Sequence, residues 1–154
     1  MNTLLEGLKR FSTGVNLVSE QDIKSFERKT QLLMPSDFAN YFKEINGSDD
    51  EYVDKLFKFY SLDQFKNVQF EFKDWHGSPK YSDLLSTMTS PENVFVFCDY
   101  QFHLFTYAVR LNINRSNIQE IYILCGGDYK TIATSLNEFL ELYFSDSPKL
   151  YFED

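Results

Sequence analysis

The side chains that could support catalysis lie within one short stretch of the sequence. Cys98, Asp99 and His103 provide a thiol, a carboxylate and an imidazole. A cysteine nucleophile needs a lowered thiol pKa, which usually comes from a helix N-terminus or from nearby cations. The sequence around Cys98 shows neither, and Cys98 ends an apolar run that is typical of a buried strand. We therefore expect a non-enzymatic protein and keep a small Cys98/His103 hydrolase only as an alternative.

A second group of functional side chains is acidic and follows the turn-forming pair Asn46-Gly47. Its carboxylates belong to Asp49, Asp50, Glu51 and Asp54. Such a cluster is most often a solvated loop, but carboxylates held at a helix corner can also occupy a basic active site and steer association. Tyr52, Asp99 and Tyr100 could add aromatic or acidic anchors to the same interface.

Two further features have a functional and a structural interpretation. Trp75 and His76 precede a Gly-Ser-Pro break, where an indole and an imidazole can mark an exposed binding loop. Trp75 could equally be a satellite core residue. Gly126-Gly127 superficially resembles a phosphate-binding loop, but no lysine or helix start follows at the required spacing, so it predicts a turn.

Composition limits the classes of partner. The net charge of -8 and the pI near 4.7 argue against direct binding of nucleic acid, which requires clustered lysine and arginine. A basic protein is the natural complement. Cys98 and Cys125 have no second cysteine or histidine at metal-ligand spacing, so we expect no zinc site, no other metal and no cofactor.

Length and hydrophobic pattern bound the domain organisation. A chain of 154 residues with 43% hydrophobic residues predicts one domain, residues 1–154, with a single sizeable core. No apolar run is long enough to span a bilayer, and residues 1–14 lack the basic and apolar regions of a secretory signal. We therefore expect a cytoplasmic protein that makes no membrane contact.

Local signals predict two helices between residues 19 and 47. Ser19 and Asp22 resemble a capping box at the start of the first helix. Pro35 opens the second helix, and Asn46-Gly47 closes it with a left-handed residue. The second helix carries an apolar stripe at i, i+3, i+4 and i+7, formed by Phe38, Tyr41, Phe42 and Ile45.

Helices are also predicted at both ends of the chain. Apolar residues between Leu4 and Phe11 suggest a short N-terminal helix that stops near Gly14. Ser135 with Glu138 forms another capping box, which begins a C-terminal helix. That helix repeats the apolar stripe with Leu136, Phe139, Leu140 and Tyr143.

The middle of the chain has the alternating or continuous apolar patterns of strands. These patterns cover residues 57–59, 68–72, 94–98, 103–111 and 121–125, and a short segment follows at 129–133. Residues 99–101 are interpreted as a hairpin turn, and residues 74–91 as an irregular excursion with a helical turn at Leu84-Leu85. The expected fold class is α+β, with N-terminal helices, a mostly antiparallel meandering sheet and a C-terminal helix packed on it.

The order and spacing of these elements resemble the SUKH superfamily. The resemblance rests on Glu20-x-x-Ile23-x-x-Phe26-Glu27, Leu33-Met34-Pro35-x-Asp37-Phe38-x-x-Tyr41-Phe42-x-x-Ile45-Asn46-Gly47, Phe59-Tyr60-Ser61-Leu62, Val94-Phe95-Val96-Phe97 and the segment from Ile132 to Leu140. It covers roughly residues 20–144. The superfamily includes Smi/Knr-type regulators of fungal cell-wall synthesis and many bacterial immunity proteins. The resemblance implies a binding scaffold without a catalytic centre, whose bacterial members neutralise toxins, frequently nucleases.

The leading hypothesis is therefore an immunity protein that binds a basic toxin domain. A regulatory scaffold that recruits a cellular partner is the alternative within binding functions. The predicted contact residues are Asp49, Asp50, Glu51, Tyr52, Asp54, Trp75, Asp99 and Tyr100.

Overall fold

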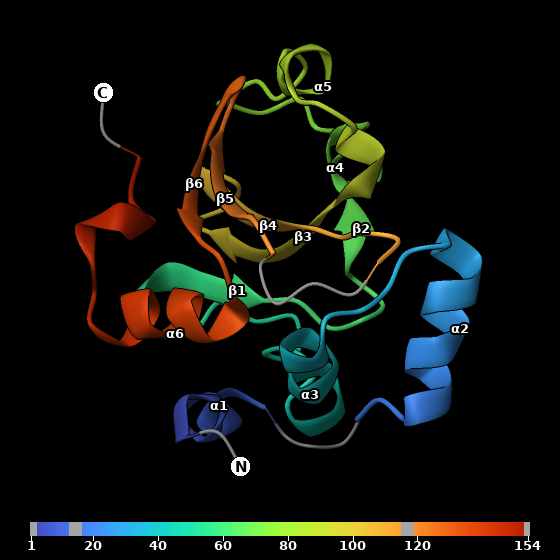
Figure 1. Ribbon diagram of the computed structural model, residues 1–154. Helices are drawn as coiled ribbons and strands as arrows, with labels where there is room; N and C mark the ends of the chain where they lie inside the picture. The colour runs from blue at the N-terminus through green and yellow to red at the C-terminus, as the bar shows by residue number, and fades with distance from the viewer. Residues whose placement is uncertain (1–2, 13–16, 115–118, 153–154) are drawn as a thin grey trace.

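The computed structural model describes residues 3–12, 17–114 and 119–152 (Figure 1). Its α-helices are α1 (Thr3–Leu8), α2 (Glu20–Thr30), α3 (Ser36–Glu44), α4 (Val68–Phe72), α5 (Leu84–Thr87) and α6 (Leu136–Phe144). Short 3₁₀ helices are η1 (Lys9–Phe11), η2 (Asp54–Leu56), η3 (Pro91–Asn93) and η4 (Pro148–Leu150). The strands are β1 (Phe57–Phe59), β2 (Lys66–Asn67), β3 (Val94–Tyr100), β4 (Phe105–Arg110), β5 (Ile121–Cys125) and β6 (Asp128–Ala133).

The described strands form one antiparallel sheet in the order β1-β3-β4-β5-β6, and β2 also pairs with β3. β3 lies between β4 on one side and the two short strands β1 and β2 on the other. The last four strands are consecutive in the chain and make an antiparallel meander. This topology, with helices before and after it, confirms the predicted α+β class.

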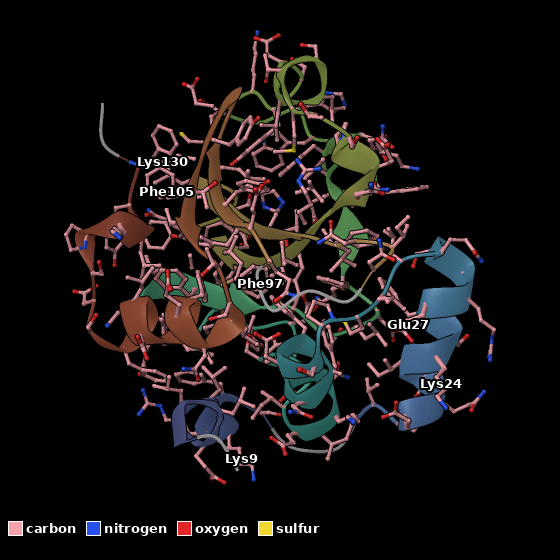
Figure 2. The ribbon with its side chains drawn as sticks, viewed as in Figure 1. Lys9, Lys24, Glu27, Phe97, Phe105 and Lys130 are labelled. Carbon is pink, nitrogen blue, oxygen red and sulfur yellow. The ribbon has the colours of Figure 1, made fainter. Side chains whose placement is uncertain are left out.

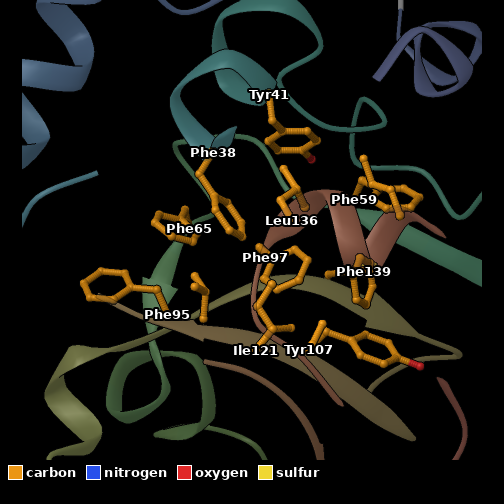
Figure 3. Close-up of a cluster of buried hydrophobic side chains, with 14 of the residues drawn as sticks. Phe38, Tyr41, Phe59, Phe65, Phe95, Phe97, Tyr107, Ile121, Leu136 and Phe139 are labelled. Atoms are coloured by element: carbon orange, nitrogen blue, oxygen red, sulfur yellow. The ribbon is translucent and has the colours of Figure 1, made fainter. Parts of the chain in front are cut away.

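One face of the sheet packs against α3 and α6 (Figure 3). The Phe97 ring lies 5.1 Å from Phe38 of α3 and 5.0 Å from Phe139 of α6, measured between ring centroids in edge-on geometry. Edge-to-face aromatic pairs add to the stability that burial of the rings provides. Figure 2 shows Phe97 in the middle of the molecule, with Lys9 and Lys24 at its periphery. The predicted packing of the C-terminal helix on the sheet is confirmed.

The opposite face of the sheet carries a smaller core. Val96 and Ala108 of the sheet are fully buried there together with Val68 of α4 and Leu84 of α5. Figure 1 shows α4 and α5 across the sheet from α3 and α6. Because both faces are covered, β3 is buried along almost its whole length, as its continuous apolar run predicts.

The helix boundaries near the N-terminus follow the predicted capping signals. The Ser19 hydroxyl accepts a hydrogen bond from the Asp22 backbone N–H at 3.2 Å, and the Asp22 carboxylate accepts one from the Ser19 N–H at 2.9 Å. After α3, Asn46 and Gly47 adopt positive φ angles, as a helix C-terminus requires. The predicted stop of the N-terminal helix at Gly14 falls outside the described residues.

Two predictions about the middle of the chain are wrong. Residues 68–72 form helix α4 and not a strand, because the Asn67 side chain caps the Phe70 N–H at 3.0 Å. Val68 and Phe72, at i and i+4, are buried, whereas Phe70 is 61% exposed. The hairpin turn also comes later than predicted, since β3 continues through Tyr100.

Candidate protein-binding site

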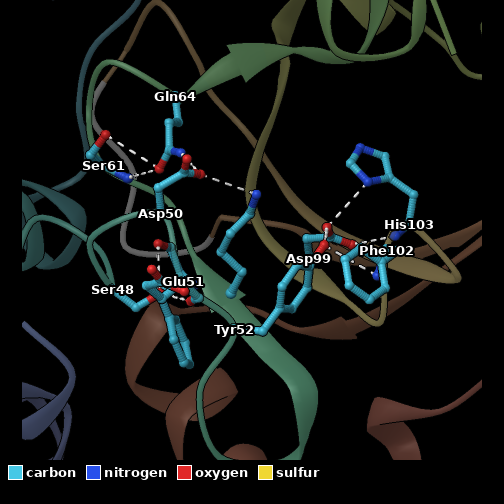
Figure 4. Close-up of polar contacts among 11 residues, drawn as sticks. Ser48, Asp50, Glu51, Tyr52, Ser61, Gln64, Asp99, Phe102 and His103 are labelled. Carbon is cyan, nitrogen blue, oxygen red and sulfur yellow. Dashed lines mark hydrogen bonds and ion pairs between the residues drawn. The ribbon is translucent and has the colours of Figure 1, made fainter.

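The acidic loop, residues 48–54, is fixed to the edge of the sheet. Gly47 precedes it with a φ of +86°, and a Cβ atom there would come within 2.7 Å of the Ser61 nitrogen, so only glycine fits. The buried Ser48 hydroxyl accepts a hydrogen bond from the Phe59 N–H at 3.0 Å and donates one to the Glu51 carbonyl at 2.7 Å. The loop is therefore held against β1 (Figure 4).

Two carboxylates of the loop have cationic neighbours. Asp50 accepts a hydrogen bond from Gln64 Nε2 at 2.8 Å and lies 3.3 Å from Lys58 Nζ. Asp54 pairs with Arg10 at 2.8 Å across the surface. Exposed ion pairs of this kind add little stability. Two further exposed carboxylates belong to Asp49 and Glu51. The loop itself carries four carboxylates and no lysine or arginine, so its own charge is negative.

Asp99 connects the loop to the β3–β4 turn. It has no exposed surface, and its carboxylate accepts hydrogen bonds from the Tyr52 hydroxyl and, at 2.7 Å, from the His103 N–H. His103 Nδ1 lies 3.1 Å from the same carboxylate. Burial, together with this carboxylate, raises the pKa of Tyr52, which keeps the hydroxyl protonated. Asp99, which we predicted as a contact residue, is therefore not exposed to a partner, because its side chain faces inward and anchors the turn.

The turn held by Asp99 has an uncommon backbone. Gln101, Phe102 and His103 all have positive φ angles, of 48°, 54° and 67°. Each non-glycine residue in the left-handed region costs about 1 kcal/mol or more. The Tyr52 hydroxyl accepts a hydrogen bond from the Phe102 N–H at 3.2 Å, and the two rings lie 4.6 Å apart. These tethers hold the Phe102 side chain in an exposed position.

An apolar surface adjoins the acidic loop at this turn. We call it the Phe102 patch; it consists of Leu56, Phe102 and Leu104, all exposed. The Gln101 N–H donates a hydrogen bond to the Leu56 carbonyl at 3.0 Å. This bond joins the segment that contains Leu56 to the turn that carries Phe102 and Leu104. Sequence reasoning missed these residues. Their only sequence signal is large apolar side chains placed next to turns, and such residues are common on protein surfaces.

The remaining two predicted contact residues are partly buried. Tyr100 packs among aromatic rings, with centroids 5.0 Å from Phe57 and 5.6 Å from Phe105. Trp75 stacks on His103 at 4.8 Å and donates its indole N–H to the Pro79 carbonyl at 2.8 Å. Both residues pack next to the β3–β4 turn and are not fully available to a partner. For Trp75 this geometry favours the satellite-core interpretation.

The geometry does not assemble the hypothetical catalytic group. Cys98 is buried in the larger core, while Asp99, the next residue of the strand, lies on the opposite face with His103. Burial raises the pKa of the Cys98 thiol well above its ordinary value, so the thiolate is disfavoured. Among the described residues, no group of three or more His, Cys, Asp or Glu side chains is arranged to hold a metal ion.

A comparison with protein families finds a match over most of the chain. A model of the SMI1/KNR4 family (SUKH-1) matches residues 17–142, which is most of the chain and includes every predicted contact residue. Among curated proteins, no sequence matches the chain. In the described part of the chain, no helix combines the length and apolarity that crossing a bilayer requires.

Proposed function

The chain belongs to the SMI1/KNR4 family (SUKH-1), and from this we propose that it is a non-enzymatic immunity protein that blocks a cognate toxin by direct contact. The family fits an immunity-protein or a regulatory-domain role. In our proposal, the acidic loop and the Phe102 patch together contact the toxin, and the toxin surface they meet is basic.

The observation that carries this proposal is the fixed position of the acidic loop beside the Phe102 patch. Protein interfaces commonly combine a small apolar centre with a polar rim, and aromatic residues dominate their binding energy. Hydrogen bonds donated by the Ser48 and Tyr52 hydroxyls, and those accepted by the Asp99 carboxylate, already order this surface, so binding loses less conformational entropy. Its negative charge complements the lysine and arginine side chains with which a nuclease binds phosphates.

Co-expression with the toxin encoded beside its gene tests the proposal. Glu51→Lys reverses an exposed charge of the acidic loop, and Asp128→Lys is the matched control in β6, at the other end of the strand order. We expect Glu51→Lys to abolish growth rescue and to slow association at least about tenfold at low salt, because rim charges steer encounter. Asp128→Lys should rescue like the unmodified protein.

Phe102→Ala tests the apolar part of the same surface. We expect faster dissociation of the purified complex, measured by biolayer interferometry, since contacts of an interface centre act mainly on the dissociation rate. If both Glu51→Lys and Phe102→Ala bind like the unmodified protein, the proposed surface is wrong. If the neighbouring gene encodes no toxin and no rescue occurs, the immunity role is wrong and a regulatory role takes its place.

A further inference from the structure

A groove of about 1100 Å³ runs between α2 and residues 61–70. Its floor is aromatic: Phe26 is partly exposed there, and Phe65 and Phe95, both almost fully buried in the larger core, lie beneath it. Their ring centroids lie 5.6 Å apart for Phe26 and Phe65, 5.5 Å for Phe26 and Phe95, and 5.1 Å for Phe65 and Phe95. Such a floor favours large apolar side chains of a ligand.

The rims of this groove are acidic. Its carboxylates come from Asp22 on α2 and from Asp49, Asp50 and Asp63 on the facing loops. Lys29 and Lys66 provide the ammonium groups among the lining residues, and Lys58 pairs with Asp50 from outside the groove, so the carboxylates still outnumber the ammonium groups. A low-dielectric floor between charged rims focuses the potential and attracts cations.

Two large apolar side chains are exposed where they line the groove. Phe70 is 61% exposed because α4 turns Val68 and Phe72 inward and leaves Phe70 outward. Leu17, which lines the groove together with α2, is also exposed. The Lys73 ammonium lies 5.4 Å from the Phe70 ring centroid, so the ring already accepts a cation on its face. A bound apolar segment would remove both side chains from water.

We propose that this groove binds a basic amphipathic segment of the partner protein, with apolar side chains on the aromatic floor and lysine or arginine at the acidic rims. The inference rests on the proposed function for the identity of the partner. It adds a second contact region, which is continuous with the acidic loop through Asp49 and Asp50. The net charge of -8 disfavours a second copy of the chain as the occupant, because two such copies repel each other.

NMR titration of the ¹⁵N-labelled chain tests the groove directly. The probe is a short synthetic peptide of leucine and lysine at helical spacing, and the comparison peptide carries glutamate in place of lysine. We expect the lysine peptide to shift the amide resonances of Leu17, Phe26 and Phe70, with an affinity at least about tenfold above that of the glutamate peptide. Equal affinity for the two peptides, or shifts confined to other surfaces, would overturn the inference.

Two phenylalanine variants locate the binding. Phe70→Ala should weaken binding of the lysine peptide about tenfold. The bound peptide would bury the Phe70 ring, and the variant has no ring to contribute this apolar contact. Phe102→Ala is the matched control, since Phe102 is 67% exposed and lies outside the groove. Both rings are exposed, so the amide spectra of the two variants should retain the dispersion of a folded protein. Unchanged affinity of Phe70→Ala, or an equal loss in Phe102→Ala, contradicts the groove.

The toxin assay separates this inference from the proposed function. If Phe70→Ala keeps full rescue and affinity while Glu51→Lys loses them, the groove is not a partner site and the acidic-loop surface stands. If Phe70→Ala loses rescue while Glu51→Lys keeps it, the groove stands and the acidic-loop surface does not. Glu51 is suited to this comparison because it does not line the groove.

Discussion

Asp99 is the residue on which the proposed surface depends most. Its carboxylate is fully buried, yet it determines what is exposed, because it holds the backbone of the turn that carries Phe102. A buried carboxylate is tolerated only where donors surround it, and here the donors are Tyr52 and His103. The same contacts offset the cost of three consecutive left-handed residues in the turn.

We expect Asp99→Ala to lower the free energy of unfolding by about 3 kcal/mol, because the donors that face the carboxylate lose a buried charged acceptor. Tyr52→Phe should cost about 1 to 2 kcal/mol, since it removes the hydrogen bond donated to Asp99 and the one accepted from the Phe102 N–H, but keeps the ring against Phe102. Urea unfolding followed by circular dichroism measures both values. If Asp99→Ala unfolds at the urea concentration of the unmodified protein, Asp99 does not anchor the turn.

At the scale of elements, capped helices were predictable because their signals are local. Ser19 and Asp22 are three residues apart, so they meet whenever a helix forms between them, whatever surrounds it. Asn67 is a signal of the same kind before α4. The strand prediction followed the apolar alternation of Val68 and Phe70 and not the Asn67 cap, although only Val68 is buried. A segment of five residues is too short to distinguish the two-residue period of a strand from the 3.6-residue period of a helix.

The candidate site was predictable only in its residue types. The acidic loop could be recognised from composition and from the turn before it. The burial of Asp99 could not, because its partner Tyr52 lies 47 positions away and meets it only once β1 pairs with β3. The Phe102 patch and the groove likewise join segments that are distant in the sequence. Their geometry is set by strand pairing and by the packing of α2 through Phe26 on Phe65 and Phe95, and not by local pattern.

Asp37 illustrates how one side chain joins two elements. Its carboxylate accepts a hydrogen bond from the Phe38 N–H at 2.8 Å, as expected for the start of α3. It also accepts one at 2.8 Å from the Leu136 N–H, at the start of α6. Both helices thus begin at the same carboxylate. Burial, the larger effect, raises the pKa of Asp37, and the hydrogen bonds from the first-turn N–H groups oppose this by favouring the charged form.

We expect Asp37→Ala to lower the free energy of unfolding by about 1 to 2 kcal/mol, because both helices lose an acceptor at their first turn. Asp37→Asn should cost less, since the amide oxygen can still accept. Asp63→Ala, at an exposed carboxylate, is the control and should stay within about 0.5 kcal/mol of the unmodified protein. Urea unfolding measures the three variants. Equal midpoints for Asp37→Ala and Asp63→Ala would show that the shared cap has no energetic role.

Across the whole molecule, the burial of tyrosine rings makes the stability of the fold depend on pH. Burial is the main cause that raises the pKa of eight tyrosines: Tyr41, Tyr52, Tyr60, Tyr81, Tyr107, Tyr122, Tyr143 and Tyr151. The pKa of Tyr122 and that of Tyr151 are raised to about 12. A group whose pKa is raised in the folded state contributes stability that is fully present below its unfolded pKa, near 10, and is lost as the pH rises.

We therefore expect the chain to unfold cooperatively in alkali. Above pH 10, each tyrosine that stays protonated only in the folded state lowers stability by about 1.4 kcal/mol per pH unit. The absorbance at 295 nm, which reports tyrosinate, should rise together with loss of the far-ultraviolet circular dichroism signal. The guanidinium-unfolded chain should ionise near pH 10. If most tyrosines ionise near pH 10 while the circular dichroism stays native, burial does not raise their pKa and the aromatic core is open to water.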